Sequence, residues 1–176
     1  VYAGFEPNAF DDKDDNFVEE WGHDTTGRFV PHWTRTENGE GHLEALVDYD
    51  KEGAGDYYVV PRRTKREAVV GPYINKVQGK DTPMVALVVP ILDANKRFLG
   101  VVGVEKSTEA FQKMVADTVL FRTGTVTLYS PTGVIIAARD ATLVGKKMIA
   151  DASYAERIVR PDNRPAEAFT IERKLD

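Results

Sequence analysis

Three apolar segments in the middle of the chain, joined by two very short turns, constrain the fold most strongly. The segments cover residues 68–77, 83–92 and 97–105, and each has the composition of a β-strand. The connections, 78–81 and 93–96, have the length and the Gly, Asp and Asn content of hairpin turns. Because parallel neighbours need a long crossover, strands joined in this way must be antiparallel. The sequence therefore predicts an antiparallel sheet.

Helical patterns flank this sheet, so the predicted fold class is α+β. Asp56 is a candidate N-cap for a short helix through residue 65, and Ser107 is one for an amphipathic helix that ends near residue 117. Shorter strands are predicted earlier in the chain, after glycine-containing turns, over residues 29–36 and 43–47.

The pattern restarts after Gly124. A hairpin with strands over 125–129 and 134–138 is followed by an expected helix over 143–158 and an expected strand over 166–175. We therefore expect two modules of the same α+β type. The first, over residues 1–118, is nearly complete, and the second, over residues 119–176, is cut short.

Composition excludes several classes of protein. The chain has 176 residues and no cysteine, so disulfides, thiolate nucleophiles and cysteine zinc sites are excluded. Its net charge of −5 argues against nucleic acid as a partner. The longest apolar run, 84–92, contains Pro90 and is far shorter than the roughly 20 residues of a membrane helix. Since the chain begins at Val1 without methionine, we expect it to be a piece of a longer protein.

The side chains that could bind a metal have the wrong spacing, so no metal site is expected. In the acidic segment 11–15, Lys13 interrupts the alternation of oxygen ligands and no glycine follows for the turn of a calcium loop. His23, His32 and His42 are nine and ten residues apart, whereas zinc sites need closer pairs. We expect these imidazoles to be packed or at the surface.

The sequence also lacks the motifs of nucleotide binding and catalysis. The segment 100–107 resembles a phosphate loop, but Glu105 stands where that loop needs glycine, and its charge would repel phosphate. No nucleophile elbow, catalytic carboxylate pair or Ser-His-Asp signature is present. We expect neither an enzyme nor a cofactor.

Aromatic residues with polar atoms remain as candidates for a binding site: Trp33, Tyr57, Tyr58 and Tyr73. Glu105 closes the third strand of the meander and can lie on the same face as Tyr73 and the short helix. Aromatic walls and one carboxylate suit a small cationic molecule, through cation–π contact and charge pairing. The alternative is that the tyrosines are ordinary core residues and that Glu105 pairs with Lys106 or Arg97.

Six motifs occur in the order typical of one family. They are FEPNAFD at 5–11, TGRFVPHW at 26–33, DYYVVP at 56–61, GPY at 71–73, PI at 90–91 and GVVGVE at 100–105. In this order they resemble the double Cache sensor domains of bacterial methyl-accepting chemotaxis proteins and receptor kinases. The resemblance extends over roughly residues 2–147.

The resemblance implies a long N-terminal helix, largely missing from this chain, followed by two PAS-like (Cache) modules with antiparallel sheets and flanking helices. It implies a small-molecule site in the first, membrane-distal module. It also implies a periplasmic or extracellular location, in a receptor that is anchored by flanking transmembrane helices and forms a homodimer.

The site residues of the family carry over in part. In members that bind amino acids, an arginine two positions before an aromatic pair holds the ligand carboxylate; here Gly55 stands two positions before Tyr57-Tyr58. The aspartate that meets the ligand amine corresponds to Glu105, and its partner position corresponds to Asn75. We therefore expect an amine or another polar small molecule rather than a standard amino acid. A sensor of a carboxylate or amino acid, and a soluble enzyme that uses the acidic segment and the histidines, are the alternatives.

Overall fold

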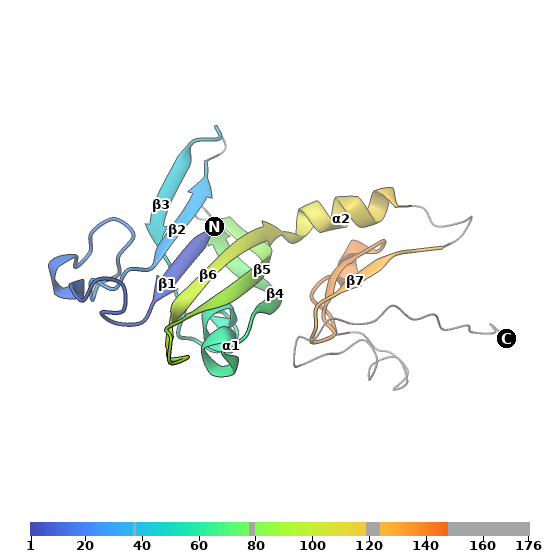
Figure 1. The fold of residues 1–176 in the computed structure, drawn as a ribbon. Coiled ribbons are helices and arrows are strands. Elements are labelled where there is room, and N and C mark those ends of the chain that lie inside the picture. Colours follow the sequence, from blue (N-terminus) through green and yellow to red (C-terminus); the bar gives the residue numbers. More distant parts are fainter. Residues whose placement is uncertain (37, 78–79, 119–123, 148–176) are drawn as a thin grey trace.

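A six-stranded antiparallel sheet with the order β3-β2-β1-β6-β5-β4 forms the main body of the computed structural model (Figure 1). The structure describes residues 1–36, 38–77, 80–118 and 124–147. The strands are β1 (Tyr2–Phe5), β2 (Pro31–Arg35), β3 (Gly41–Ala45), β4 (Ala68–Val77), β5 (Lys80–Leu92) and β6 (Phe98–Ser107). The predicted meander of β4, β5 and β6 and the α+β class are confirmed.

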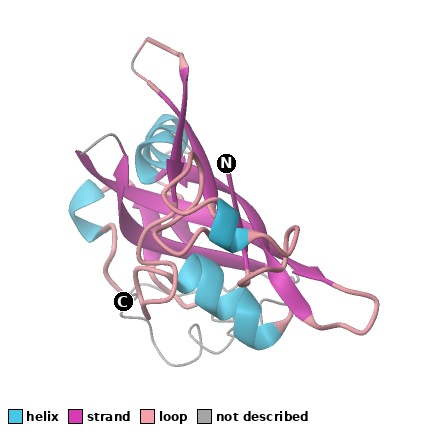
Figure 2. Ribbon diagram, turned by 90° about the vertical axis from the view of Figure 1, so that its left-hand side faces the viewer, coloured by secondary structure: helices cyan, strands magenta, loops and turns pink. Residues whose placement is uncertain are grey.

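Strand β1 lies in the centre of the sheet and was missed by the sequence analysis. Its residue Tyr2 pairs with Gly103 of β6 on one side and with His32 of β2 on the other. The start of the chain thus joins the meander to the β2–β3 hairpin, whose tip extends beyond the rest of the sheet (Figure 2). Without β1, the two halves of the sheet would share no hydrogen-bonded edge.

One helix covers the core face of the sheet. Helix α1 (Asp56–Thr64) packs against β4, β5 and β6, and its Tyr57, Tyr58 and Pro61 are buried. The N-cap is Gly55 rather than the expected Asp56, whose carboxylate instead accepts a hydrogen bond from the Gly53 nitrogen at 2.8 Å. The main core beneath the helix is apolar and aromatic: Tyr2, Val30, Leu46, Tyr57, Tyr58, Ala68, Val70, Ala86, Val88, Phe98 and Val101.

The side chains of β5 and β6 alternate between the two faces of the sheet, as strand geometry requires. Val88 and Val101 are buried against α1, whereas the alternate positions are about half exposed: Leu87, Val89, Val102 and Val104. Glu105 has the same parity as Val101 and Gly103. Its carboxylate therefore starts from the core face of the sheet, on the side of α1.

A smaller unit follows β6. Helix α2 (Thr108–Asp117) has Ser107 at its N-cap position, as expected, and packs against a hairpin of β7 (Thr127–Tyr129) and β8 (Ile135–Ala138). The Gln112 side chain donates to the backbone oxygen of Ala138 and accepts from its nitrogen at 3.2 Å. Two short 3-10 helices complete the described elements, η1 (Asp14–Asn16) and η2 (Ala141–Leu143).

The expected hairpin after Gly124 is confirmed, but the helix expected over 143–158 is wrong where the structure describes it. Leu143 ends η2, and Lys147 forms a β-bridge with Val134. The rest of that helix and the strand expected over 166–175 lie outside the described residues. Within the described ranges, no helix combines the length and the apolar character needed to cross a membrane.

Replacing Gly103 by alanine should destabilise the fold by about 1–3 kcal/mol, because the added methyl group overpacks the core. Its Cβ would lie 2.4 Å from Cζ and the hydroxyl oxygen of Tyr2, a fully buried ring packed between Tyr57 and His32. Urea denaturation measures the effect. Gly41→Ala is the control, since no atom lies within 4 Å of the place that a Cβ would take there. Equal stability of the two variants would contradict this packing.

Candidate ligand-binding site

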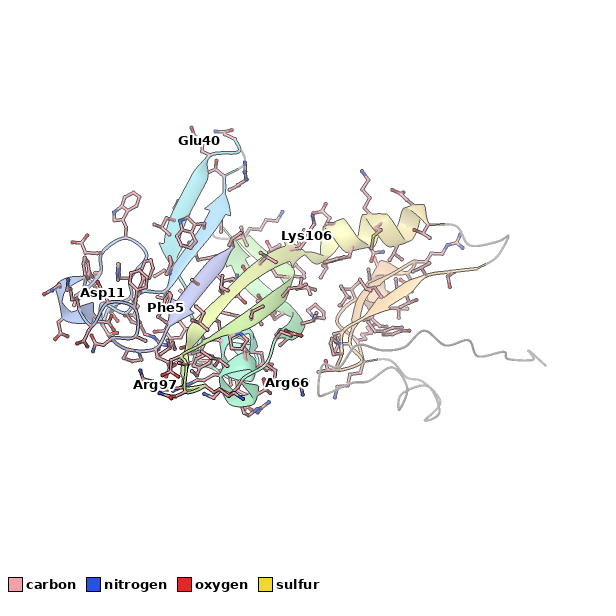
Figure 3. The ribbon with its side chains drawn as sticks, viewed as in Figure 1. Phe5, Asp11, Glu40, Arg66, Arg97 and Lys106 are labelled. Atoms are coloured by element: carbon pink, nitrogen blue, oxygen red, sulfur yellow. The ribbon has the colours of Figure 1, made fainter. Side chains whose placement is uncertain are left out.

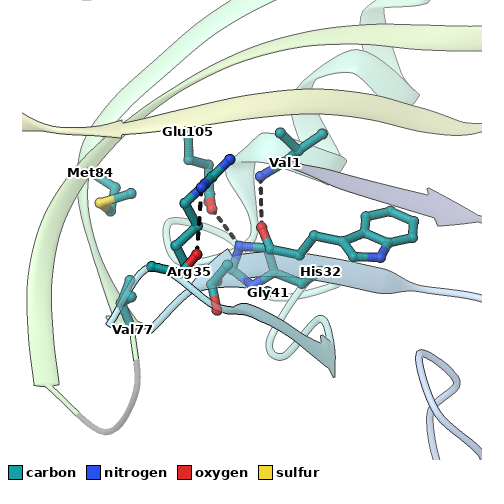
Figure 4. A pocket seen from close by; sticks show the side chains of 10 residues that line it. Val1, His32, Arg35, Gly41, Val77, Met84 and Glu105 are labelled. Atoms are coloured by element: carbon teal, nitrogen blue, oxygen red, sulfur yellow. Dashed lines mark hydrogen bonds and ion pairs between the residues drawn. The ribbon is translucent and has the colours of Figure 1, made fainter. Parts of the chain in front are cut away.

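A cavity of about 570 Å³ opens between the β2–β3 hairpin and the β4–β5–β6 meander (Figure 4). Such a volume suits a small molecule. The residues that line it come from both halves of the sheet: Val1, His32, Trp33, Thr34, Arg35, Gly39, Gly41, Val77, Met84 and Glu105.

Glu105 is the most buried charged group of this cavity, with a side chain that is only 2% exposed. Its Oε1 accepts hydrogen bonds from the Tyr73 hydroxyl and, at 3.3 Å, from the Asn75 amide. Both donors lie on β4, two strands away. They reach the carboxylate past Ala86, the small residue that pairs with Glu105 on the intervening β5. The expected grouping of Glu105, Tyr73 and Asn75 is therefore present.

The second carboxylate oxygen faces His32, which the sequence analysis did not select. His32 Nε2 lies 2.9 Å from Glu105 Oε2, and Nδ1 lies 3.4 Å from Glu44 Oε1 of β3. The imidazole is 6% exposed. Because Tyr2 of β1 pairs with both His32 and Gly103, the position of β1 places β2 within reach of β6. The spacing of the histidines gives no signal for this contact.

Polar contacts keep Glu105 ionised. Burial by itself raises the pKa of Glu105, but hydrogen bonding with His32 and Tyr73 and the charge of His32 lower it below its ordinary value of 4.5. The reverse holds for Tyr73, since burial and the nearby Glu105 charge raise the pKa of its hydroxyl. At neutral pH the cluster therefore contains a carboxylate and a neutral phenol.

Tyr57 lies behind this cluster rather than on the cavity wall, where the sequence analysis placed it. Its ring stacks on Tyr73 with centroids 5.7 Å apart and meets Tyr2 edge-on at 5.2 Å. The hydroxyl donates to the Val47 oxygen at 2.7 Å, and the residue is 3% exposed. Neither Tyr57 nor Tyr73 is among the residues that line the cavity.

Tyr58 belongs to a different cluster, so its expected place on the cavity wall is corrected. Its hydroxyl donates to Glu6 and accepts from Arg28, and its ring meets Phe98 edge-on at 5.6 Å. Successive helical residues are about 100° apart around the axis. The side chains of Tyr57 and Tyr58 consequently point to different parts of the core.

Trp33 is the aromatic residue that lines the cavity as expected. It is 45% exposed and adjoins His32 on β2, with Arg35 two residues further along the same strand. Aromatic and cationic side chains therefore border the cavity on β2.

The alternative partners considered for Glu105 lie elsewhere. Arg97, in the turn between β5 and β6, binds Asp93 with its Nε 3.2 Å from Oδ2 (Figure 3). Lys106 follows Glu105 directly on β6, so its side chain starts from the opposite face of the sheet. Neither of them faces Glu105 Oε2; His32 does, with Nε2 at 2.9 Å.

Buried polar atoms without a hydrogen-bond partner gather at this site. Among the described residues they are Tyr2 Oη, Thr34 Oγ1, Glu44 Oε1 and Glu105 Oε2. The two carboxylate oxygens are the ones that His32 approaches at ion-pair distance. Buried polar atoms are normally paired, so such a group marks a place for polar ligand atoms. No set of three metal-ligating side chains comes together in the described ranges.

Gly55 leaves no room for the arginine found in the amino-acid-binding pattern. A Cβ at this position would lie 2.3 Å from the backbone oxygen of Asp48 and 2.7 Å from that of Tyr49. Any side chain at residue 55 would require the 48–49 backbone to move. The packing of the loop before α1 therefore requires glycine at residue 55, where the amino-acid-binding pattern has arginine.

Comparison with known proteins gives relatives of one kind. No family model matches the chain. Methyl-accepting chemotaxis protein TlpQ of Pseudomonas aeruginosa is 26% identical over 91% of this chain and 24% of its own length. The extracellular domain of mmHK1S-Z3, a protein described as a histidine kinase, is 32% identical, with a TM-score of 0.75 over 90% of this chain. The solved structure of methyl-accepting chemotaxis protein X is 26% identical, with a TM-score of 0.68 over 89% of this chain.

The chain is related to the sensor domains of chemoreceptors and of a histidine kinase. The α+β fold with its antiparallel sheet matches a PAS-like Cache sensor domain, which confirms the resemblance noted in the sequence. The chain spans about a quarter of TlpQ and 58% of each of the two solved chains.

Acid should weaken the fold through Glu105. Because its pKa is lower in the folded state, the carboxylate contributes stability that is complete above about pH 4.5 and is lost as the pH falls through the folded-state pKa. Glu105→Gln removes this contribution. The free energy of unfolding, measured by urea denaturation between pH 3 and 7, should therefore fall more steeply in acid for the wild type than for the variant. Parallel curves would contradict the assignment.

Proposed function

We propose that this chain is the extracytoplasmic sensor domain of a bacterial receptor, and that its cavity binds a small amine without making or breaking bonds. One observation supports this most directly. A buried, ionised Glu105 borders a cavity of ligand size, and the contact of its Oε2 is the ion-pair approach of His32 Nε2 at 2.9 Å. The kinship with sensor domains of chemoreceptors and kinases supports the sensory role.

The charge and the walls of the cavity favour an ammonium group. Glu105 supplies a charge-assisted hydrogen-bond acceptor, and Trp33 supplies an exposed aromatic face for cation–π contact. The backbone around Gly55 excludes the arginine that would hold an amino acid carboxylate. Tyr73 and Asn75 do not line the cavity; they donate hydrogen bonds to the Glu105 carboxylate and hold it in place.

A second candidate ligand is an amino acid or another molecule that carries a carboxylate. The observation that favours it is Arg35, whose side chain lines the same cavity as Glu105 (Figure 4). A guanidinium is a good partner for a carboxylate, because its planar donors match the two oxygens. A ligand with both charges could then use both residues.

The fold offers a short path from the cavity to the second unit. Glu105 stands two residues before Ser107, the N-cap residue of α2, and Gln112 of α2 hydrogen-bonds both backbone groups of Ala138. A ligand that moves Glu105 would bias the position of α2 and hence of β8. We propose that residues 1–118 bind the ligand and that residues 119–176 pass the signal on, in a membrane-anchored homodimer.

Calorimetric titration with 2-phenylethylamine, butylamine and the standard L-amino acids tests this function. We expect an amine to bind, and Glu105→Gln to weaken it by about 1.5–3 kcal/mol through loss of a charge-assisted hydrogen bond. Glu109→Gln is the matched control, because Glu109 is exposed on α2 and away from the cavity. Binding of L-amino acids alone would favour the second candidate, and unchanged amine affinity in Glu105→Gln would contradict the proposed role of Glu105.

The two buried tyrosine hydroxyls should have different effects on binding. Tyr73→Phe removes a hydrogen bond to Glu105 and should weaken amine binding by about 0.5–1.5 kcal/mol. Tyr58→Phe removes a hydrogen bond to Glu6, outside the cavity, and should lower stability by a similar amount while leaving affinity unchanged. Calorimetry and urea denaturation of both variants measure the two effects. Weaker binding in Tyr58→Phe alone would contradict the proposed site.

A further inference from the structure

His32 stands between two carboxylates, each from a neighbouring part of the sheet. Its Nε2 is 2.9 Å from Glu105 Oε2 of β6, and its Nδ1 is 3.4 Å from Glu44 Oε1 of β3. A neutral imidazole has one N–H donor and one lone pair. In its neutral form the ring would therefore always turn a lone pair toward one of the carboxylates. Only the imidazolium has an N–H on both nitrogens, one for each carboxylate.

The carboxylates of Glu105 and Glu44 are the main electrostatic contacts of His32. Tyr2 of β1 presents its ring edge-on, and its phenol stays neutral because burial raises the pKa of its hydroxyl. On β3, His42 lies behind Glu44, with Nε2 3.8 Å from Glu44 Oε2. The remaining charged side chain on the cavity is Arg35 on the same strand.

We propose that protonated His32 occupies the place of the ligand at Glu105, and that an amine binds by exchange for one proton. This inference rests on the proposed function. In the free protein, the imidazolium is the cation beside Glu105 Oε2. When an ammonium group enters, Nε2 of His32 releases its proton to solvent and the ring keeps its Nδ1 proton toward Glu44. The ammonium then donates one hydrogen bond to Glu105 Oε2 and one to the lone pair of Nε2.

This exchange conserves the charge of the site. One ammonium enters, one proton leaves, and Glu105 stays ionised, as its lowered pKa allows. The distance of 2.9 Å between Nε2 and Oε2 leaves no space for a third atom, so the imidazole must shift when the ligand enters. Ligand binding is thereby coupled to a movement of β2, which pairs with β1 on one side and with β3 on the other.

The exchange predicts the direction in which amine affinity changes with pH. Amine affinity should rise about tenfold per pH unit while His32 is protonated in the free protein, and should become constant once it is neutral. Calorimetry with 2-phenylethylamine between pH 5.5 and 8.5 measures this slope. In His32→Gln the slope should disappear. His42→Gln is the matched control and should retain it, because the exposed His42 contacts Glu44 rather than Glu105.

A second measurement uses the wild type alone, in case His32→Gln does not fold. Titration at pH 6 in two buffers of different ionisation enthalpy counts the protons released, and the exchange predicts about one proton per amine. Amine binding with no proton release, or with the same pH slope in His32→Gln, would overturn the exchange while leaving the proposed function in place. The absence of binding by any amine at pH 8.5 would instead contradict the proposed function.

Discussion

A carboxylate that is almost completely removed from water must be neutralised or hydrogen-bonded, and this requirement organises the cavity. Glu105 of β6 meets it with partners from two other strands: Tyr73 and Asn75 of β4 donate to one oxygen, and His32 of β2 lies beside the other. Removing a partner from a buried charge is strongly destabilising. These contacts therefore hold both halves of the sheet together at the Glu105 carboxylate. The cavity lies where they meet.

The cluster also connects ligand recognition with the architecture. Strand β6 carries Glu105 and continues into α2, which packs against β8 of the second unit. Strand β2 carries His32 and Trp33 and is paired to the centre of the sheet through β1. A molecule that contacts both strands therefore touches the two halves of the sheet that β1 joins. Such a position suits a sensor better than a peripheral cleft would.

The sequence predicted the parts of this arrangement that depend on local patterns. Short turns specified the meander, and the antiparallel strands were sufficient to place Tyr73 and Glu105 on one face. Asn75 was added by the family resemblance. Tyr57 and Tyr58 show the limit of this reasoning, because adjacent helical residues cannot share one wall, and only the packing shows which cluster each one joins. Trp33 was predicted to be an aromatic wall of the site and does line the cavity.

The contact between His32 and Glu105 could not be predicted, because it depends on a strand of four residues inserted between β2 and β6. Tyr2–Phe5 is too short to show a clear period, and no spacing in the sequence relates residue 32 to residue 105. The helix expected after Leu143 failed for a similar reason: a non-local bridge between Val134 and Lys147 prevails over local helical propensity.

The crystal structure of this chain with a bound amine would test the central claim most directly. The account predicts ligand density in the cavity beside Trp33, with the amine nitrogen within hydrogen-bond distance of Glu105 Oε2 and the imidazole of His32 displaced from its position in the free protein. Density for the amine elsewhere, or an unchanged His32–Glu105 contact with the ligand bound, would contradict it.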